Sequence, residues 1–147
     1  MSIFSRRIIW AMVAVAFLGF LDAVFLTIEH YTNNIPPCFA LTGCEQVTTS
    51  VYATVAGIPV ALAGAAYYFL ILVVGLLYLD LRNAKLLTAM SYLPIVGLLA
   101  SIYFVSLQLF VIKALCLYCV VSAMTSTTLF ILGLIVLQLR KKEVSHE

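Results

Sequence analysis

Long apolar tracts and short polar stretches alternate along the chain. About 20 apolar residues span the hydrocarbon core of a bilayer as a helix. Four tracts reach that length, over about residues 8–28, 57–79, 86–112 and 116–139. Between the first two lies a polar loop, about 29–56, that is rich in the Asn, Pro and Gly residues that break helices. Within it, residues 48–55 are amphipathic enough for a short interfacial helix. The pattern predicts an all-α integral membrane bundle of four transmembrane helices, as one domain over residues 1–147.

Composition agrees with a membrane protein. Hydrophobic residues make up 65% of the chain and charged residues 10%, whereas a soluble domain has roughly 45–50% apolar and about 25% charged residues. A water-soluble globule is therefore excluded. The net charge of +2 is small and the basic residues stand at tract ends, so we expect no nucleic-acid partner.

The basic residues also predict an orientation, because Lys and Arg near span ends are retained on the cytoplasmic side. With four spans, one side of the membrane holds only Lys113 of the 8 basic residues. The other side holds Arg6, Arg7, Arg82, Lys85, Arg140, Lys141 and Lys142. We therefore expect a multi-pass protein of the cell (inner) membrane with both termini cytoplasmic and the 29–56 loop facing outward.

All 4 cysteines fall on the outward, oxidising side in this arrangement. Cys116 and Cys119 form a C-x-x-C at the start of the fourth helix, where free N–H groups and the helix dipole favour a thiolate. Residues three apart share a helix face, so this pair can close into a disulfide and reopen. Cys38 and Cys44 form a second pair in the loop, and exchange through mixed disulfides can connect the two pairs.

Two other interpretations of the cysteines stay open. Outward cysteines often form stabilising disulfides, although a bridge across a C-x-x-C closes too short a loop to stabilise the fold much. Four thiols can also hold zinc. Zinc sites usually present two C-x-x-C knuckles, whereas Cys38 and Cys44 are six positions apart. We expect no metal.

A dithiol that is oxidised repeatedly must pass its electrons to an acceptor. The sequence carries no flavin or nicotinamide signature and no haem-attachment C-x-x-C-H. A lipid-soluble quinone is the acceptor that fits a site embedded in a membrane, and bacterial periplasms are kept oxidising by a quinone-coupled system. Cys119 lies about one helical turn deeper than Cys116, so we expect Cys119 to be the sulfur nearest the quinone.

Three more residues are candidates for the quinone site. Asp22 lies within the first apolar tract, in its outer half, and an intramembrane carboxyl is a functional candidate by default. Its alternative role is a protonated acid that is hydrogen-bonded inside the bundle. Ser50 and Tyr52 follow the loop cysteines closely, so they either seat the loop over the site or belong to a surface helix.

An ordered set of motifs carries a resemblance to a known family. The set is Cys38, Cys44, Ser50, Tyr52, Gly57-Ile58-Pro59, Gly64, Tyr67 and Cys116-Leu117-Tyr118-Cys119. With this set of motifs, the chain resembles the prokaryotic, quinone-reducing branch of the vitamin K epoxide reductase family. The resemblance covers about residues 8–139. The resemblance implies four helices around a quinone pocket near the outer surface. It also implies that Cys38 exchanges with a thioredoxin-like partner, that Cys44 passes electrons to Cys116, and that Cys119 contacts the quinone.

The resemblance includes two departures. Many bacterial members carry a fused thioredoxin-like domain, and the chain stops at Glu147, so we expect the partner to be a separate, exported thioredoxin-fold protein. Animal members carry an asparagine four residues before the glycine that opens the second helix and a tyrosine four residues after the second C-x-x-C cysteine. Those positions are Ala53 and Ala123 here, which favours plain reduction of ubiquinone or menaquinone over epoxide reduction.

The sequence thus predicts an enzyme, a quinone-dependent membrane thiol-disulfide oxidoreductase that supports disulfide bond formation. The rival hypothesis is a small four-helix membrane transporter or assembly protein whose cysteines form structural disulfides.

Overall fold

A computed structural model describes the backbone of residues 3–145. Its long helices are α1 (Ile3–Tyr31), α3 (Val60–Leu81), α4 (Ala84–Ser106) and α5 (Leu117–Ser145). Among the described residues, 4 spans are long and apolar enough to cross a membrane: Ser5–Tyr31, Val60–Leu81, Ala84–Ile112 and Leu117–Lys142. The predicted all-α membrane bundle is confirmed.

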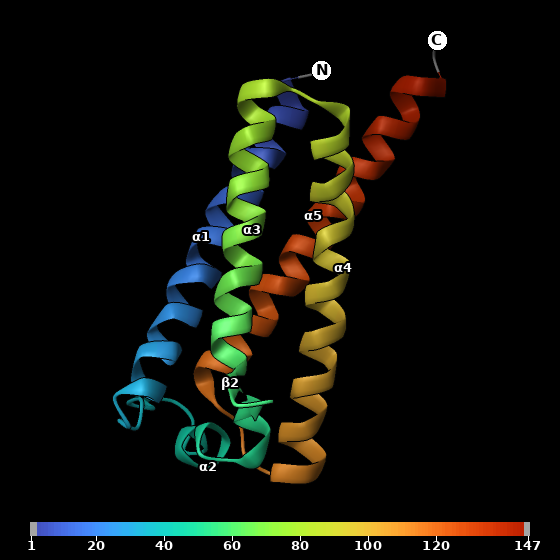
Figure 1. The fold of residues 1–147 in the computed structure, drawn as a ribbon. Coiled ribbons are helices and arrows are strands. Elements are labelled where there is room, and N and C mark those ends of the chain that lie inside the picture. Colours follow the sequence, from blue (N-terminus) through green and yellow to red (C-terminus); the bar gives the residue numbers. More distant parts are fainter. Residues whose placement is uncertain (1–2, 146–147) are drawn as a thin grey trace.

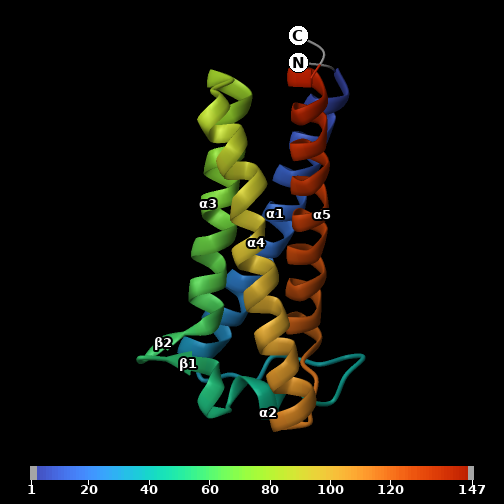
Figure 2. The same cartoon turned by 90° about the vertical axis from the view of Figure 1, so that its right-hand side faces the viewer.

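The four long helices form a ring in which each packs against two neighbours. Helix α1 packs against α3 and α5, and α4 packs against the same two helices. The described ends of the chain both lie at the same end of the bundle, while the loop between α1 and α3 closes the other end (Figures 1 and 2). This arrangement places the loop cysteines and the start of α5 at the same end.

The bundle core consists of large apolar side chains with a polar link across it. Ile9, Met12, Ile71, Met90 and Leu129 are fully buried. The link is made by the Tyr68 hydroxyl on α3, which lies 2.7–3.0 Å from a group of oxygens on α5. These oxygens belong to the side chains of Ser122, Thr125 and Ser126 and to the Ser122 carbonyl. The buried hydroxyl thus has partners, as a polar group in a membrane interior requires.

The loop is more structured than predicted, and the interfacial helix expected over 48–55 is wrong in its position. The loop contains a short helix α2 (Cys44–Thr48), a 3-10 turn η1 (Val51–Ala53) and a hairpin of β1 (Thr54–Val55) and β2 (Ile58–Pro59). Ala56 and Gly57 both have positive φ, 52° and 79°. Positive φ at both central residues is typical of a type I′ hairpin turn, which takes residues 54–59 out of helical conformation.

The helix boundaries differ from the prediction near this hairpin and at both ends of the bundle. Pro59 has extended ψ (133°) and precedes α3, so the second span begins at Val60 and not at 57. The first helix continues to Tyr31, and the fourth begins at Leu117 and runs beyond the expected end at 139 to Ser145. The loop therefore covers residues 32–59, as long as the predicted 29–56 but shifted along the chain.

The third span ends in an unexpected π-helix, η2 (Leu107–Ile112). Lys113 follows in the left-handed conformation, with φ 56°. The wider turn of a π-helix changes which side chains point inward, and such segments are frequent at functional sites. Here Gln108 is buried within η2, close to the C-x-x-C in sequence and in space.

Candidate functional site

The four cysteines lie in one apolar cluster at the loop end of the bundle. Cys38 and Cys44 are joined as a disulfide, the loop disulfide, with Cα atoms 6.1 Å apart. Cys116 and Cys119, the C-x-x-C pair, are free thiols. The cysteine cluster contains buried Cys44, Val47 and Cys116, with partly buried Cys38, Ile112, Ala114, Leu117, Tyr118 and Cys119 packed against them. The loop pair therefore lies against the C-x-x-C pair, as a thiol relay requires.

Two contacts hold the loop against the start of α5. Gly43 packs directly on the backbone of Leu115, where a Cβ added to the glycine would lie 2.6 Å from the Leu115 nitrogen and oxygen. The Tyr118 hydroxyl donates a hydrogen bond of 2.8 Å to the carbonyl of Pro37, next to the loop disulfide. The small residue at 43 thus lets the cysteine loop approach more closely than any side chain would allow.

The C-x-x-C pair is positioned by the first turn of α5 and by Gln108. Cys116 directly precedes the helix, and its carbonyl accepts the N–H of Val120. Its own N–H donates to the side-chain oxygen of Gln108, at 3.0 Å. Gln108 thus accepts a hydrogen bond from the C-x-x-C backbone and also lines the adjacent cavity.

Cys116 is set up to carry the thiolate of the pair. The hydrogen bond from the Cys119 thiol lowers the pKa of the Cys116 thiol from 9.0 to about 7, although burial acts in the opposite direction. The backbone N–H groups of Cys119 and Tyr118 lower this pKa further. The lowered pKa increases the share of the Cys116 thiolate near neutral pH, which suits sulfur exchange.

The four sulfurs differ in exposure. Cys44 is 1% exposed and Cys116 0%, whereas Cys38 and Cys119 are partly exposed. Cys38 thus faces the surface of the loop and Cys119 faces a cavity inside the bundle. Each pair thus has one buried sulfur and one accessible sulfur.

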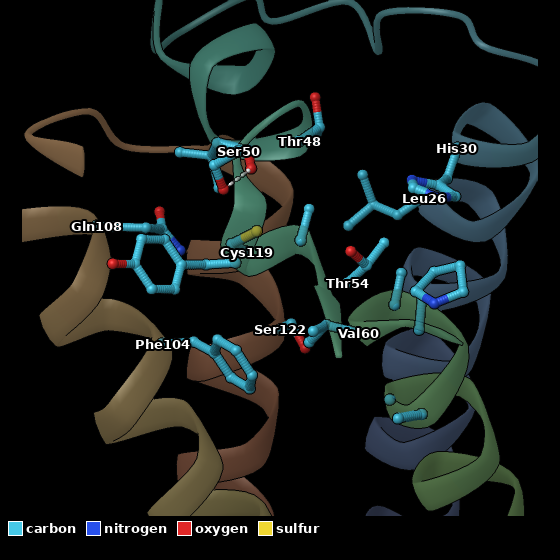
Figure 3. A pocket seen from close by; sticks show the side chains of 18 of the residues that line it. Leu26, His30, Thr48, Ser50, Thr54, Val60, Phe104, Gln108, Cys119 and Ser122 are labelled. Carbon is cyan, nitrogen blue, oxygen red and sulfur yellow. Dashed lines mark hydrogen bonds between the residues drawn. The ribbon is translucent and has the colours of Figure 1, made fainter. Parts of the chain in front are cut away.

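A cavity of about 760 Å³ opens beneath the loop between the helices. Figure 3 shows Cys119, Gln108 and Phe104 on one side of it and Leu26 and His30 of α1 on another. The four residues predicted for the quinone site, Cys119, Asp22, Ser50 and Tyr52, all line this cavity. Its volume lies in the range of about 300–1,000 Å³ that is typical of ligand pockets.

The predicted site residues lie in different settings around the cavity. The Ser50 hydroxyl donates to the carbonyl of Val47 at 2.8 Å, so it closes the short α2 helix under the loop. Tyr52 stands on η1 and is 39% exposed. Asp22 reaches the cavity from α1, and its Oδ2 atom is buried with no hydrogen-bond partner among the described residues.

Possible metal ligands are sparse in the described part of the chain. No group of three or more His, Cys, Asp or Glu side chains there could hold a metal ion. Two of the four thiols are joined in the loop disulfide. The other two thiols, those of Cys116 and Cys119, are free.

Comparison with known proteins places most of the chain in one family. The model of the vitamin K epoxide reductase family matches residues 10–134. No curated protein matches the chain. The matched range contains all four cysteines and every residue named above as lining the cavity.

Proposed function

The chain belongs to the vitamin K epoxide reductase family, a family of membrane oxidoreductases, and we propose that it generates disulfides in an exported thioredoxin-fold protein by reducing a quinone. The observation that carries this proposal is the cysteine cluster, in which a closed loop disulfide lies against a free C-x-x-C pair. The cavity next to Cys119 supports the quinone part of the proposal.

The first step is exchange between the partner and the loop disulfide. A thiolate of the partner attacks Cys38, whose sulfur is the more exposed of the loop pair, and Cys44 leaves as a thiolate. The second thiol of the partner then displaces Cys38. The partner ends as a disulfide, and the loop pair gains two electrons and the matching protons.

The second step returns the loop pair to its oxidised form. Cys44 attacks the Cys116–Cys119 disulfide at Cys116, which is its buried neighbour in the cysteine cluster. Cys119 leaves, and Cys38 then displaces Cys116 from Cys44. The product has a closed loop disulfide and a reduced C-x-x-C pair, which is the pairing present in the structure.

The third step passes the electrons to a quinone in the cavity. A quinone ring is apolar on its faces and carries two carbonyl oxygens that accept hydrogen bonds. The cavity fits such a ligand because apolar side chains dominate its walls, while the buried Oδ2 of Asp22 and the hydroxyl of Tyr67 have no hydrogen-bond partners among the described residues. Native proteins rarely leave buried polar atoms unpaired without a reason such as a ligand. We infer that ubiquinone or menaquinone occupies this cavity and accepts two electrons and two protons from the C-x-x-C pair.

A disulfide-trapping experiment tests the thiol chemistry. The probe is a thioredoxin-fold protein whose single remaining active-site cysteine carries a thionitrobenzoate group. Cys44→Ser retains the accessible Cys38, so it should displace the coloured thionitrobenzoate and form a stable mixed disulfide. Cys38→Ser retains only the buried Cys44 in the loop, so the mixed disulfide should form at least tenfold more slowly.

The same experiment separates the enzyme from the rival transporter or assembly protein. If the cysteines were structural, both variants would misfold or would show no selective reaction with the probe. Equal rates for the two variants would contradict the assignment of Cys38 as the residue that meets the partner.

A further inference from the structure

The cavity contains an acid that the proposed thiol chemistry does not use. Asp22 lines the cavity from α1, and Cys119 lines it from α5, the helix that packs against α1. A carboxyl group within a membrane span is costly and usually functional.

The hydrogen bonding around Asp22 indicates that its partner is a ligand. Among the described side chains, buried polar atoms without a hydrogen-bond partner occur on two residues, Asp22 and Tyr67, and both line this cavity. Ser126 on α5 lies near both tyrosines, and its hydroxyl is 2.9 Å from the hydroxyl of Tyr68. The two unpaired groups come from different helices, α1 and α3, and line the same cavity as Cys119.

Tyr67 packs against a glycine on the neighbouring helix α4. A Cβ added to Gly97 of α4 would overlap the Tyr67 hydroxyl. The hydroxyl therefore occupies the space that a side chain at position 97 would take. This contact fixes the direction of the second unpaired group.

The chemistry of a quinone requires a proton-transfer group at this point. The Cys119 thiol donates its hydrogen bond to Cys116, so Cys119 must lose a proton before its sulfur can enter a disulfide. A quinone oxygen must gain a proton as it accepts electrons. Separated charges are unfavourable in an apolar cavity, so a group that moves the proton as the electrons move lowers the barrier.

We propose that Asp22 is a catalytic proton-transfer residue that connects Cys119 to the quinone, with the Tyr67 hydroxyl as a hydrogen-bond donor to the second quinone oxygen. This inference rests on the proposed quinone reduction. One carboxyl oxygen of Asp22 gives its proton to a quinone oxygen while the other takes the proton that leaves Cys119, so Asp22 ends in the form in which it began.

The step balances. Cys116 and Cys119 lose two electrons and two protons as their disulfide forms, and the quinone gains two electrons and two protons to become a quinol. The proton of Cys119 moves through Asp22. The proton of Cys116 exchanges with water at the loop end of the cavity, and the second proton of the quinol comes from that water.

Other titratable side chains around the cavity must be distinguished from Asp22. They are Glu29 and His30 on α1, Tyr52 on η1, Tyr67 and Tyr68 on α3, and Cys119 on α5. Glu29 lies seven residues beyond Asp22, about 10 Å further along the helix towards the loop. Neither Glu29 nor His30 has a buried atom without a partner among the described residues.

The test compares Asp22→Asn with Asp80→Asn, the same chemical change at an exposed position on α3 outside the cavity. Asp22→Asn keeps the shape and a hydrogen-bonding group but cannot carry the proton. We expect kcat for quinone reduction to fall about 100-fold, with KM for the quinone changed less than about threefold. Asp22→Glu should recover part of kcat, and Asp80→Asn should behave as wild type.

This design distinguishes the loss of proton transfer by Asp22 from a folding defect and from a failure of the quinone proposal. Mixed-disulfide formation at Cys38 in the Asp22 variants reports an intact fold, because it does not involve the cavity. If Asp22→Asn does not fold, Asp22→Glu tests the role of Asp22 in its place. This variant retains the carboxyl at a shifted position and should lower kcat more than it changes KM.

An unchanged kcat and pH profile in folded Asp22→Asn would overturn the role of Asp22 while leaving quinone reduction intact. A wild-type protein that reduces no quinone would overturn both proposals.

Discussion

Two cysteines three residues apart acquire different properties from their positions at the start of α5. Cys116 is fully buried, receives a hydrogen bond from Cys119 and has its N–H bound by Gln108. Cys119 faces the cavity. One sulfur is therefore suited to exchange with the loop, and the other to contact a quinone.

This asymmetry predicts a pH dependence for the C-x-x-C pair. Because the pKa of Cys116 is lowered to about 7 by the Cys119 hydrogen bond, its thiolate should form as pH rises through 7 and be lost below it. In Cys119→Ala that hydrogen bond is absent, so the midpoint should move upward, towards 9.0. Thiolate absorbance near 240 nm, in protein with Cys38→Ser and Cys44→Ser, measures both midpoints.

The same midpoint in both proteins would contradict the assigned cause. An unaltered far-ultraviolet spectrum in Cys119→Ala serves as the folding control.

Residue chemistry was partly predictable from the sequence. Spacing and topology identified the two cysteine pairs, and an acid inside an apolar tract identified Asp22. The contact of Gln108 with Cys116 was not predictable, because it depends on the π-helical turn of η2, for which the sequence offers no recognised signal.

At the scale of elements, the loop between α1 and α3 is held closely against the start of α5. The backbone contact of Gly43 with Leu115 brings the loop disulfide to the C-x-x-C pair. Transfer between sulfurs depends steeply on position, since a misplacement of about 1 Å can cost roughly 100-fold in rate.

We therefore expect Gly43→Ala to slow quinone reduction driven by the partner about 10- to 100-fold. The added methyl must displace the Leu115 backbone or move the loop away. Quinone reduction should stay close to the wild-type rate when a small dithiol reduces the C-x-x-C pair directly. Thr42→Ala, at the exposed neighbouring position, is the matched control and should leave both rates unchanged.

A Gly43→Ala protein in which both rates fall together would indicate a general packing defect. Partner-driven turnover equal to wild type would show that the close approach is unnecessary.

The sequence predicted the elements that are defined by the length of an apolar tract. It did not predict those that depend on local backbone geometry. All four spans were found because an apolar tract of that length has few other stable solutions. The β1–β2 hairpin was missed because its turn is Ala56-Gly57, with the non-glycine Ala56 at φ 52°, and not one of the Asn-Gly or Asp-Gly pairs that mark type I′ turns.

At the scale of the whole molecule, the bundle separates two ends. The described chain ends lie at one end, and the loop between α1 and α3 lies at the other (Figures 1 and 2). The cysteine cluster joins this loop to the start of α5. The predicted orientation places the cysteine end outside the cytoplasm, where thiol oxidation is favoured.

Reporter fusions test this orientation. Alkaline phosphatase should be active when fused after Asn34, in the loop, and inactive when fused after Arg82, in the turn between α3 and α4. A fluorescent protein fused at the C-terminus should mature, because that end is expected in the cytoplasm. The opposite pattern of phosphatase activity would contradict the predicted orientation.

The central claim is that electrons pass from a partner dithiol through the four cysteines to a quinone. The most direct test measures quinone reduction by the purified protein in detergent, supplied with a reduced thioredoxin-fold substrate, for wild type and Cys119→Ala. Our account predicts steady turnover with ubiquinone or menaquinone in wild type and its loss in the variant. A folded wild-type protein that reduces neither quinone would contradict it, and would favour a membrane protein with structural disulfides.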